Sequence, residues 1–310
     1  MTLPQEHPGQ EHPGLVVVGH GRHFWVEDSD GQRRLCHPRG KQGGCVVGDR
    51  VWWLPSGDTG TIERVEPRRN SLFRQDETRT KVFAANIDAV WITLAAQPEI
   101  SLLQLSRVLI AAEAQDLPCV IVLNKRDLQE PFARAWDALA PYREMGYEVL
   151  PLSTLHGNED DRQALCQKLQ GQSTLVLGPS GAGKSTLVNL LVPQARAATA
   201  ALSQSVQTGR HTTTCTALYW IDAERTTALL DSPGFQEFGL RHIDASQLAG
   251  YMPDLHRHAI HCRFLDCKHL REPGCAVLAA VDRGEHPVHG ARYRIYEQLY
   301  EEIVSMRRFR

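Results

Sequence analysis

Hydrophobic and polar residues alternate differently in successive parts of the chain, and the first pattern predicts a β-barrel. Between residues 15 and 65, short apolar runs are separated by Gly, Asp and Ser turns, with no helical period. Closely spaced runs of this kind are typical of strands in a small closed barrel such as the OB-fold. The predicted strands cover residues 15–18, 23–26, 50–54 and 60–65, in a barrel that we place at residues 15–68.

The second pattern alternates apolar strands with amphipathic helices. Mostly apolar runs cover residues 89–94, 119–123, 148–152, 174–177 and 228–230. Between the first two runs, one helical face carries Leu102, Leu105, Val108, Leu109 and Ala112. This alternation predicts a doubly wound α/β domain with a parallel sheet at residues 82–240. The ligand of such a domain is expected at the carboxyl ends of the strands.

The remaining stretches are polar or turn-rich. Residues 1–14 contain the pentapeptide Gln-Glu-His-Pro-Gly twice in succession, which predicts a disordered tail. Residues 69–81, rich in Arg and polar side chains, are interpreted as a linker. Residues 241–310 combine clustered Cys and His with a terminal amphipathic helix, which predicts a small helical domain.

Composition adds limits on compartment and partners. The 310 residues are 42% hydrophobic and 23% charged, as in ordinary globular proteins of two or three domains. There is no apolar run of membrane-spanning length and no secretion leader, so we expect a cytoplasmic protein without a membrane partner. A net charge of -2 gives no overall attraction to RNA, so any RNA binding would depend on local basic patches. The Arg residues of the barrel, interleaved with Phe and Trp, could form such a surface. These aromatic residues fit the core of the barrel equally well, with the charged residues on a solvated face.

A phosphate-binding pattern follows the predicted strand 174–177. Residues 178–185 read Gly-Pro-Ser-Gly-Ala-Gly-Lys-Ser and lead into a helical run. In this pattern the backbone N–H groups and the helix N-terminus hold phosphates, Lys184 neutralises their charge, and the Ser185 hydroxyl binds magnesium. The predicted phosphate-binding residues are Gly178, Pro179, Ser180, Gly181, Ala182, Gly183, Lys184, Ser185 and Thr186.

The base is predicted from a second motif, Asn124-Lys125-Arg126-Asp127, at the end of another strand. The Asp127 carboxylate can accept both adjacent donors on the guanine edge, whereas adenine would leave it poorly paired. The Asn side chain either bonds the base or ties loops together, and the Lys stem is expected along the purine plane. Backbone groups of Ser153 and Thr154 are further expected base contacts. The predicted ligand is therefore GTP.

The third nucleotide motif is Asp231-Ser232-Pro233-Gly234, after the strand at 228–230. Its Asp is expected to hold magnesium through water, and the N–H of Gly234 to meet the γ-phosphate. Residues 209–214 read Gly-Arg-His-Thr-Thr-Thr and are placed as a switch loop, in which we favour Thr213 as a magnesium ligand.

The order of these motifs predicts a circularly permuted domain, because the base-reading motif precedes the phosphate loop. The segment after Gly234 therefore runs directly into the C-terminal domain. Phe235 stands where many GTPases place a water-orienting glutamine, and Phe cannot perform that role. His211 is the candidate catalytic residue for the water, beside Lys184 on the phosphates, although an ordinary loop histidine fits the pattern equally. We expect slow turnover that a partner accelerates.

A metal site is predicted in the C-terminal domain by the spacing C-x4-C-x-H-x5-C. Three thiolates and one imidazole in a short loop are typical of a closed, structural zinc site. The predicted ligands are Cys262, Cys267, His269 and Cys275, with His256, His258 and His261 as alternatives.

These motifs together resemble the RsgA family of small ribosomal subunit biogenesis GTPases, over nearly the whole chain after the tail. The resemblance implies an OB-fold, zinc, magnesium with GTP, hydrolysis stimulated by the small ribosomal subunit, and contact with its rRNA during late assembly. In that family the switch histidine, here His211, is a proposed catalytic residue. We expect a monomer.

Two other function classes stay open. A GTP-dependent metal chaperone would need an exchangeable, solvent-open metal site. The other class is RNA binding outside the ribosome, by a non-ribosomal RNA-binding GTPase or by a non-enzymatic module. Such a module would use the barrel and the zinc segment alone and would keep its function after Lys184→Ala.

Overall fold

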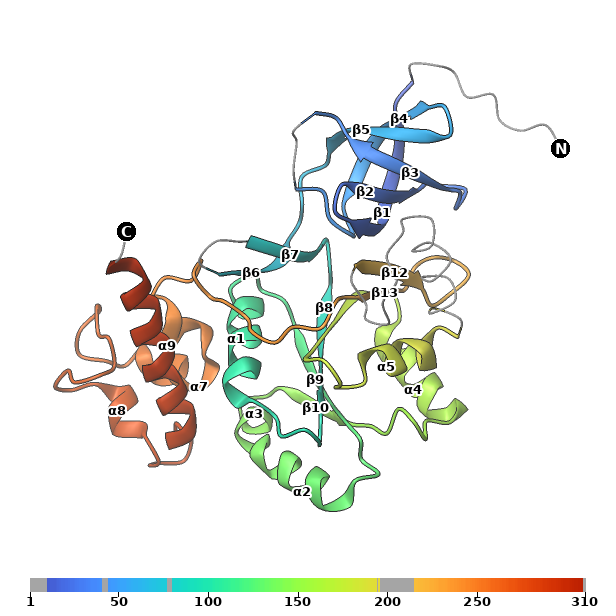
Figure 1. The fold of residues 1–310 in the computed structure, drawn as a ribbon. Coiled ribbons are helices and arrows are strands. Elements are labelled where there is room, and N and C mark those ends of the chain that lie inside the picture. The colour runs from blue at the N-terminus through green and yellow to red at the C-terminus, as the bar shows by residue number, and fades with distance from the viewer. Residues whose placement is uncertain (1–9, 41–43, 77–79, 194, 196–214, 309–310) are drawn as a thin grey trace.

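The computed structural model describes residues 10–40, 44–76, 80–193, 195 and 215–308. Figure 1 shows a barrel at the N-terminal end, a central sheet flanked by helices, and a group of helices at the C-terminal end. These are the three parts that the sequence predicts. Among the described residues, no helix combines the length and the apolar character needed to cross a membrane.

Five strands form the barrel. They are β1 (His12–His20), β2 (His23–Glu27), β3 (Arg33–Pro38), β4 (Arg50–Ser56) and β5 (Thr59–Val65). Their order is β1-β2-β3-β5-β4, and the pairing of β4 with β1 closes the barrel. Alternate positions of the strands point inward and are buried, including Val16, Phe24, Val51 and Ile62.

The barrel begins earlier than the sequence indicates. Strand β1 starts at His12, so residues 12–14 are not part of a disordered tail as expected. His12 lies opposite Trp53 in the β1–β4 pairing, with ring centroids 5.4 Å apart, and this contact orders a stretch whose composition is turn-like. The rest of the expected tail, residues 1–9, lies outside the described residues. Strand β3 was also not predicted, because its sequence Arg-Arg-Leu-Cys-His-Pro has few apolar residues.

A two-stranded hairpin lies between the barrel and the central sheet. Its strands are β6 (Ser71–Gln75) and β7 (Thr80–Ala85), which pair antiparallel. Strand β6 and the start of β7 fall in residues 69–81, the stretch interpreted as a linker, and the rest of β7 lies in the predicted nucleotide-binding domain. Leu72 and Phe83 are buried and belong to the main hydrophobic core. The polar composition of β6 hides this strand from sequence analysis.

The central sheet has the predicted doubly wound form. Strands β8 (Ala89–Ala95), β9 (Cys119–Asn124), β10 (Glu148–Pro151), β11 (Ser173–Leu177) and β13 (Ala228–Asp231) run parallel in the order β10-β9-β8-β11-β13. Strand β12 (Thr216–Trp220) lies antiparallel beside β13 at the edge. Every residue of β8 is buried, as expected for a central strand covered on both faces.

Helices cover the two faces of this sheet. Helices α4 (Glu159–Leu169) and α5 (Lys184–Leu191) pack on the face that includes Trp91 and Val176. Helices α1 (Leu102–Glu113), α2 (Gln129–Ala138) and α3 (Ala140–Glu144) contribute to the core on the opposite face. The alternation of side chains along each strand produces these two cores.

Strand β12 also joins the barrel to the central sheet. It pairs antiparallel with β1, with Val18 opposite Ala217 and Gly19 opposite Thr216. The indole Nε1 of Trp220 donates to the buried carboxylate of Glu27 in β2, at 2.7 Å. The barrel and the nucleotide-binding sheet therefore form one hydrogen-bonded sheet.

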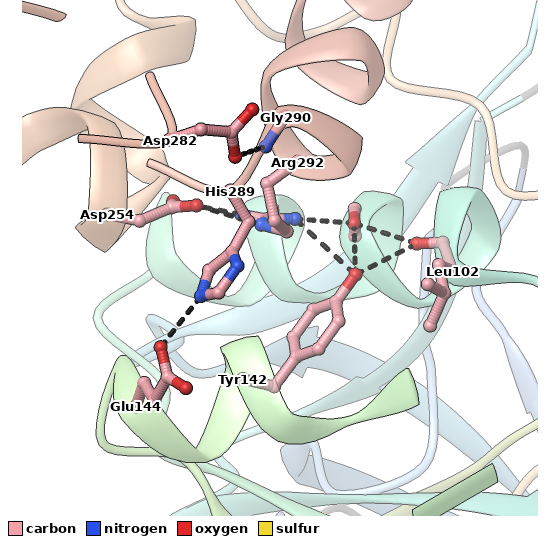
Figure 2. A network of polar contacts seen from close by, with 9 residues as sticks. Leu102, Tyr142, Glu144, Asp254, Asp282, His289, Gly290 and Arg292 are labelled. Atoms are coloured by element: carbon pink, nitrogen blue, oxygen red, sulfur yellow. Dashed lines mark hydrogen bonds and ion pairs between the residues drawn. The ribbon is translucent and has the colours of Figure 1, made fainter. Parts of the chain in front are cut away.

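The C-terminal part consists of η1 (Leu248–Tyr251), α7 (Pro253–Ala259), α8 (Ala276–Ala280) and α9 (Gly290–Arg308). It lies beside α1 in Figure 1, and its buried residues Leu248, Leu255 and Leu299 extend the core that α1 forms. Figure 2 shows Arg292 of α9 between Asp254 of α7 and Tyr142 of α3, which anchors this part to the nucleotide-binding domain.

Candidate nucleotide site and metal centre

The phosphate loop leaves β11 at Gly178 and enters α5 at Lys184. Two of its glycines have a positive φ and leave no room for a side chain. At Gly178, with φ of 153°, a Cβ would lie 2.1 Å from the Thr93 carbonyl oxygen. At Gly183, with φ of 95°, a Cβ would lie 2.1 Å from the amide nitrogen of Asn124. The loop is thus fitted closely against β8 and the base-reading motif.

Lys184 points into this loop and is only 7% exposed. Its Nζ donates to the carbonyl oxygens of Gly178 at 2.8 Å and Pro179 at 2.9 Å. Burial lowers the pKa of Lys184, and the nearby Asp231 carboxylate opposes that shift. A buried ammonium inside a loop of backbone N–H groups is suited to bind an anion such as phosphate.

Asn124 connects the phosphate loop to the base-reading loops. Its side chain is 2% exposed, its Nδ2 donates to the Ala182 carbonyl at 3.0 Å, and its Oδ1 accepts from the Thr154 N–H at 3.0 Å. The sequence left two roles open for Asn124, a bond to the base or a connection between loops. In the structure its side chain connects the loops. Three loops that are far apart in the sequence therefore share one buried amide.

Asp127 and Ser153 lie together at the predicted base position. The Ser153 hydroxyl donates to the Asp127 carboxylate at 2.5 Å, and this bond is the main cause of the lowered pKa of Asp127. The expected role of Ser153 was through its backbone, so this side-chain contact was missed. The hydrogen bond from the hydroxyl favours the ionised carboxylate of Asp127 and fixes its orientation. A carboxylate in this state can accept hydrogen bonds from the two adjacent donors of guanine.

The ammonium group of Lys125 binds the loop that follows β8. Its φ is 66°, and its Nζ donates to the carbonyl oxygen of Gln97 at 2.5 Å. Gln97 carries no motif, and sequence analysis did not find it. The only feature of the sequence that could indicate Gln97 is its position just after β8, at the carboxyl edge where the other site residues lie.

The sensor motif lies against the phosphate loop. A Cβ at Gly234 would be 2.9 Å from the Ser180 hydroxyl and 3.0 Å from the Lys184 Nζ, so a larger residue would displace these side chains. The N–H of Phe235 donates to the Gly178 carbonyl at 3.4 Å. Asp231, at the end of β13, is 6% exposed.

Phe235 turns into the core and not toward solvent. It is 5% exposed, and its ring meets that of Phe238 edge-on at 5.5 Å. It therefore cannot position a water molecule. Two other expected site residues, His211 and Thr213, lie outside the described residues.

Four donor atoms converge at the candidate metal centre. The Cys262, Cys267, His269 and Cys275 ligand atoms all lie within 4.8 Å of one another. The Cys262 and Cys275 sulfurs are 3.8 Å apart, and each is 3.5 Å from Nδ1 of His269. Tetrahedral zinc with bonds of about 2.3 Å would hold sulfurs roughly 3.8 Å apart, so these donors fit it. No other group of this kind occurs among the described residues, so His256, His258 and His261 do not form one.

The loop that holds these ligands is also fixed by helix α9. The Tyr293 hydroxyl donates to the His269 carbonyl at 2.8 Å, and the Tyr296 hydroxyl to the Lys268 carbonyl at 2.6 Å. Glu272 accepts from the N–H groups of Lys268, Leu270 and Arg271 at 3.0 to 3.1 Å. The metal centre and α9 thus support one another.

Comparisons with known proteins agree with this geometry. A family model described as RsgA GTPase matches residues 65–241. A Variovorax paradoxus (strain S110) protein named small ribosomal subunit biogenesis GTPase RsgA is 58% identical over 298 residues, covering 96% of this chain and 94% of the relative. A Burkholderia pseudomallei (strain K96243) protein of the same name is 46% identical over 305 residues, covering 98% and 96%.

Solved structures show the same architecture. The crystal structure of YjeQ from Thermotoga maritima superposes with a TM-score of 0.72 at 29% identity, covering 95% of this chain and 99% of that one. The structure of YloQ, described as a circularly permuted GTPase, gives a TM-score of 0.69 at 25% identity, covering 98% of each chain. The similarity to YloQ agrees with the motif order in this sequence.

Proposed function

Because this chain belongs to the RsgA GTPase family, and is therefore a GTP hydrolase, we propose that it acts on the small ribosomal subunit. There it assists late maturation, binds rRNA, and hydrolyses GTP to GDP and phosphate at a rate that the subunit stimulates. The names of the relatives support this proposal, since both refer to small-subunit biogenesis. We also propose that the protein is a monomer in the cytoplasm.

One observation supports the nucleotide site above others, the buried amide of Asn124. It bonds both Ala182 of the phosphate loop and Thr154 of the base-reading loop. A single nucleotide bound to both loops would have its phosphates at Lys184 and its base at Asp127. The proposed site therefore takes one guanine nucleotide across the three loops that Asn124 joins.

The phosphate end of the site has a division of roles. Lys184 neutralises the β- and γ-phosphates, and the Gly234 N–H meets the γ-phosphate. Ser185, Asp231 and Thr213 are proposed to hold magnesium, because hydroxyl and carboxylate oxygens are its preferred ligands. When bound, magnesium neutralises phosphate charge that develops during transfer. Phe235 is buried in the core and cannot orient the attacking water. We therefore propose that His211 orients it.

The metal centre is proposed to be a structural zinc site. The protein supplies four donors, which fill a tetrahedral shell and leave no position for exchange with a client. A metal chaperone needs such an open position, so this donor set does not favour that function.

Base recognition provides the test of the nucleotide site. Asp127→Asn replaces two acceptors by one acceptor and one donor, which suits xanthine, where a carbonyl oxygen replaces the 2-amino group of guanine. We expect GTP affinity to fall by about 100-fold or more and the nucleotide preference to shift to XTP. Equilibrium binding of labelled GDP and XDP, with GTP and XTP turnover, measures both.

The control is Asp160→Asn, at an exposed carboxylate of α4. It should leave the preference for guanine unchanged. If Asp127→Asn retained that preference as Asp160→Asn does, Asp127 would not read the base.

A further inference from the structure

The backbone that follows the sensor is held by two side chains of helix α1. Gln104 and Arg107 are one turn apart and reach the same residue, Phe238. The Phe238 N–H donates to Oε1 of Gln104 at 3.0 Å, and Nη1 of Arg107 donates to the Phe238 carbonyl at the longer distance of 3.5 Å. Both backbone polar groups of this residue, which is 1% exposed, therefore depend on α1.

Arg107 also bonds the C-terminal helix. It is 7% exposed, its Nη1 donates to Oε1 of Glu302 at 2.9 Å, and its Nη2 makes a second, shorter contact with Oε2. A guanidinium paired with a carboxylate in this bidentate way has a narrow range of geometry. The position of α9 is thus connected through one residue to the segment after Gly234.

Packing alone does not fix the start of this segment. A mainly apolar cavity of about 120 Å³ separates Phe235 and Ser180 from the first turn of α1. One side of Phe235 thus has room to move. Farther along, the backbone is well anchored, since the Gln75 N–H donates to the Gly239 carbonyl at 3.1 Å. Phe238 therefore lies between the sensor residue Gly234 and the part of the segment that is anchored to β6.

We propose that Gln104 and Arg107 are positioning residues for GTP hydrolysis, which set the place of Gly234 and transmit the position of α9 to it. This inference rests on the proposed function of Gly234 as the γ-phosphate sensor. Neither side chain touches the nucleotide. Their effect is confined to steps that involve the γ-phosphate, because GDP makes no contact with the sensor.

Substitution of Gln104 tests the first half of the proposal. Gln104→Met keeps the shape of the side chain and removes the acceptor of the Phe238 N–H, while Gln104→Glu retains an acceptor. For Gln104→Met we expect kcat to fall by about tenfold, with GDP affinity unchanged and a smaller preference for a non-hydrolysable GTP analogue over GDP. Gln104→Glu should restore both values.

The outcomes separate this inference from the function on which it rests. If the wild-type chain hydrolyses GTP and Gln104→Met matches it in kcat and in analogue preference, the positioning role is overturned and the GTPase is not. Equal loss of GDP and analogue binding would indicate a merely structural role and also overturn it. A wild-type chain that bound no GTP would overturn both.

The connection to α9 is tested at Glu302, far along the chain from every nucleotide motif. Glu302→Ala leaves Arg107 without its carboxylate, and we expect kcat to fall by about threefold or more while GDP affinity is unchanged. Glu301→Ala is the matched control, at an exposed neighbour on the same helix. Identical kcat values for the two variants would contradict the link from α9 to the sensor.

Discussion

At the scale of single residues, Arg292 shows how the C-terminal helices are fixed to the nucleotide-binding domain. It is 3% exposed and forms a bidentate pair with Asp254 at 3.0 and 3.1 Å. Its Nη1 also donates to the Ser106 hydroxyl at 2.7 Å, and its guanidinium lies over the Tyr142 ring at 5.0 Å. These partners come from three different helices, α7, α1 and α3. Arg292 is the cation that pairs with the buried Asp254 carboxylate in this network.

Removal of one partner should therefore be costly. Arg292→Met leaves the Asp254 carboxylate buried without its cation, and we expect a destabilisation of about 3–5 kcal/mol. Urea denaturation followed by far-ultraviolet circular dichroism measures it, with Arg294→Met at an exposed position of α9 as the control. The double variant Arg292→Met with Asp254→Leu should recover much of the loss. Equal denaturation midpoints for Arg292→Met and Arg294→Met would contradict this account.

At the scale of elements, the parallel strands with apolar runs could be predicted and the polar strands could not, while the apolar edge strand β12 was also not predicted. All five parallel strands of the central sheet coincide with mostly apolar runs, and in a central strand such as β8 burial on both faces requires this composition. Strands β3 and β6 are only partly buried, and their Arg and Gln residues resemble loops. The start of β1 depends on the contact between His12 and Trp53, which no local pattern announces.

The candidate site follows the same rule. Motif residues such as Lys184 and Asp127 are recognisable because their chemistry needs fixed spacing after a strand. Gln104, by contrast, meets Phe238 across 134 positions of sequence, and nothing near it indicates the contact. Contacts of this kind come from the packing of α1 on the sheet and need the folded structure.

Metal removal tests the C-terminal element. The loop between Cys262 and Cys275 leaves its large apolar side chains Phe264 and Leu265 exposed, so it has little core of its own. Loss of the proposed zinc should therefore unfold it and release the carbonyls that Tyr293 and Tyr296 hold. We expect hydrogen exchange to accelerate in residues 260–275 and in the first turns of α9 after chelation, and to be unchanged in β8. Added zinc should restore protection. Unchanged exchange in a verified metal-free sample would contradict a structural role.

At the scale of the whole molecule, the nucleotide site is connected to both flanking parts. Strand β12 pairs with β13 on one side and with β1 of the barrel on the other. On the opposite side, Arg107 connects the segment after the sensor to Glu302 of α9. A large partner that contacts the barrel and the C-terminal helices together would thus act on both ends of the nucleotide site.

The most direct test of this account is GTP turnover with and without purified small ribosomal subunits. Phe235 cannot orient water, so we expect slow turnover alone and an increase of about tenfold or more with subunits, equivalent to about 1.4 kcal/mol of transition-state stabilisation. Lys184→Ala should abolish turnover under both conditions. Wild-type turnover that is the same with and without subunits would contradict the central claim that the small subunit triggers this GTPase.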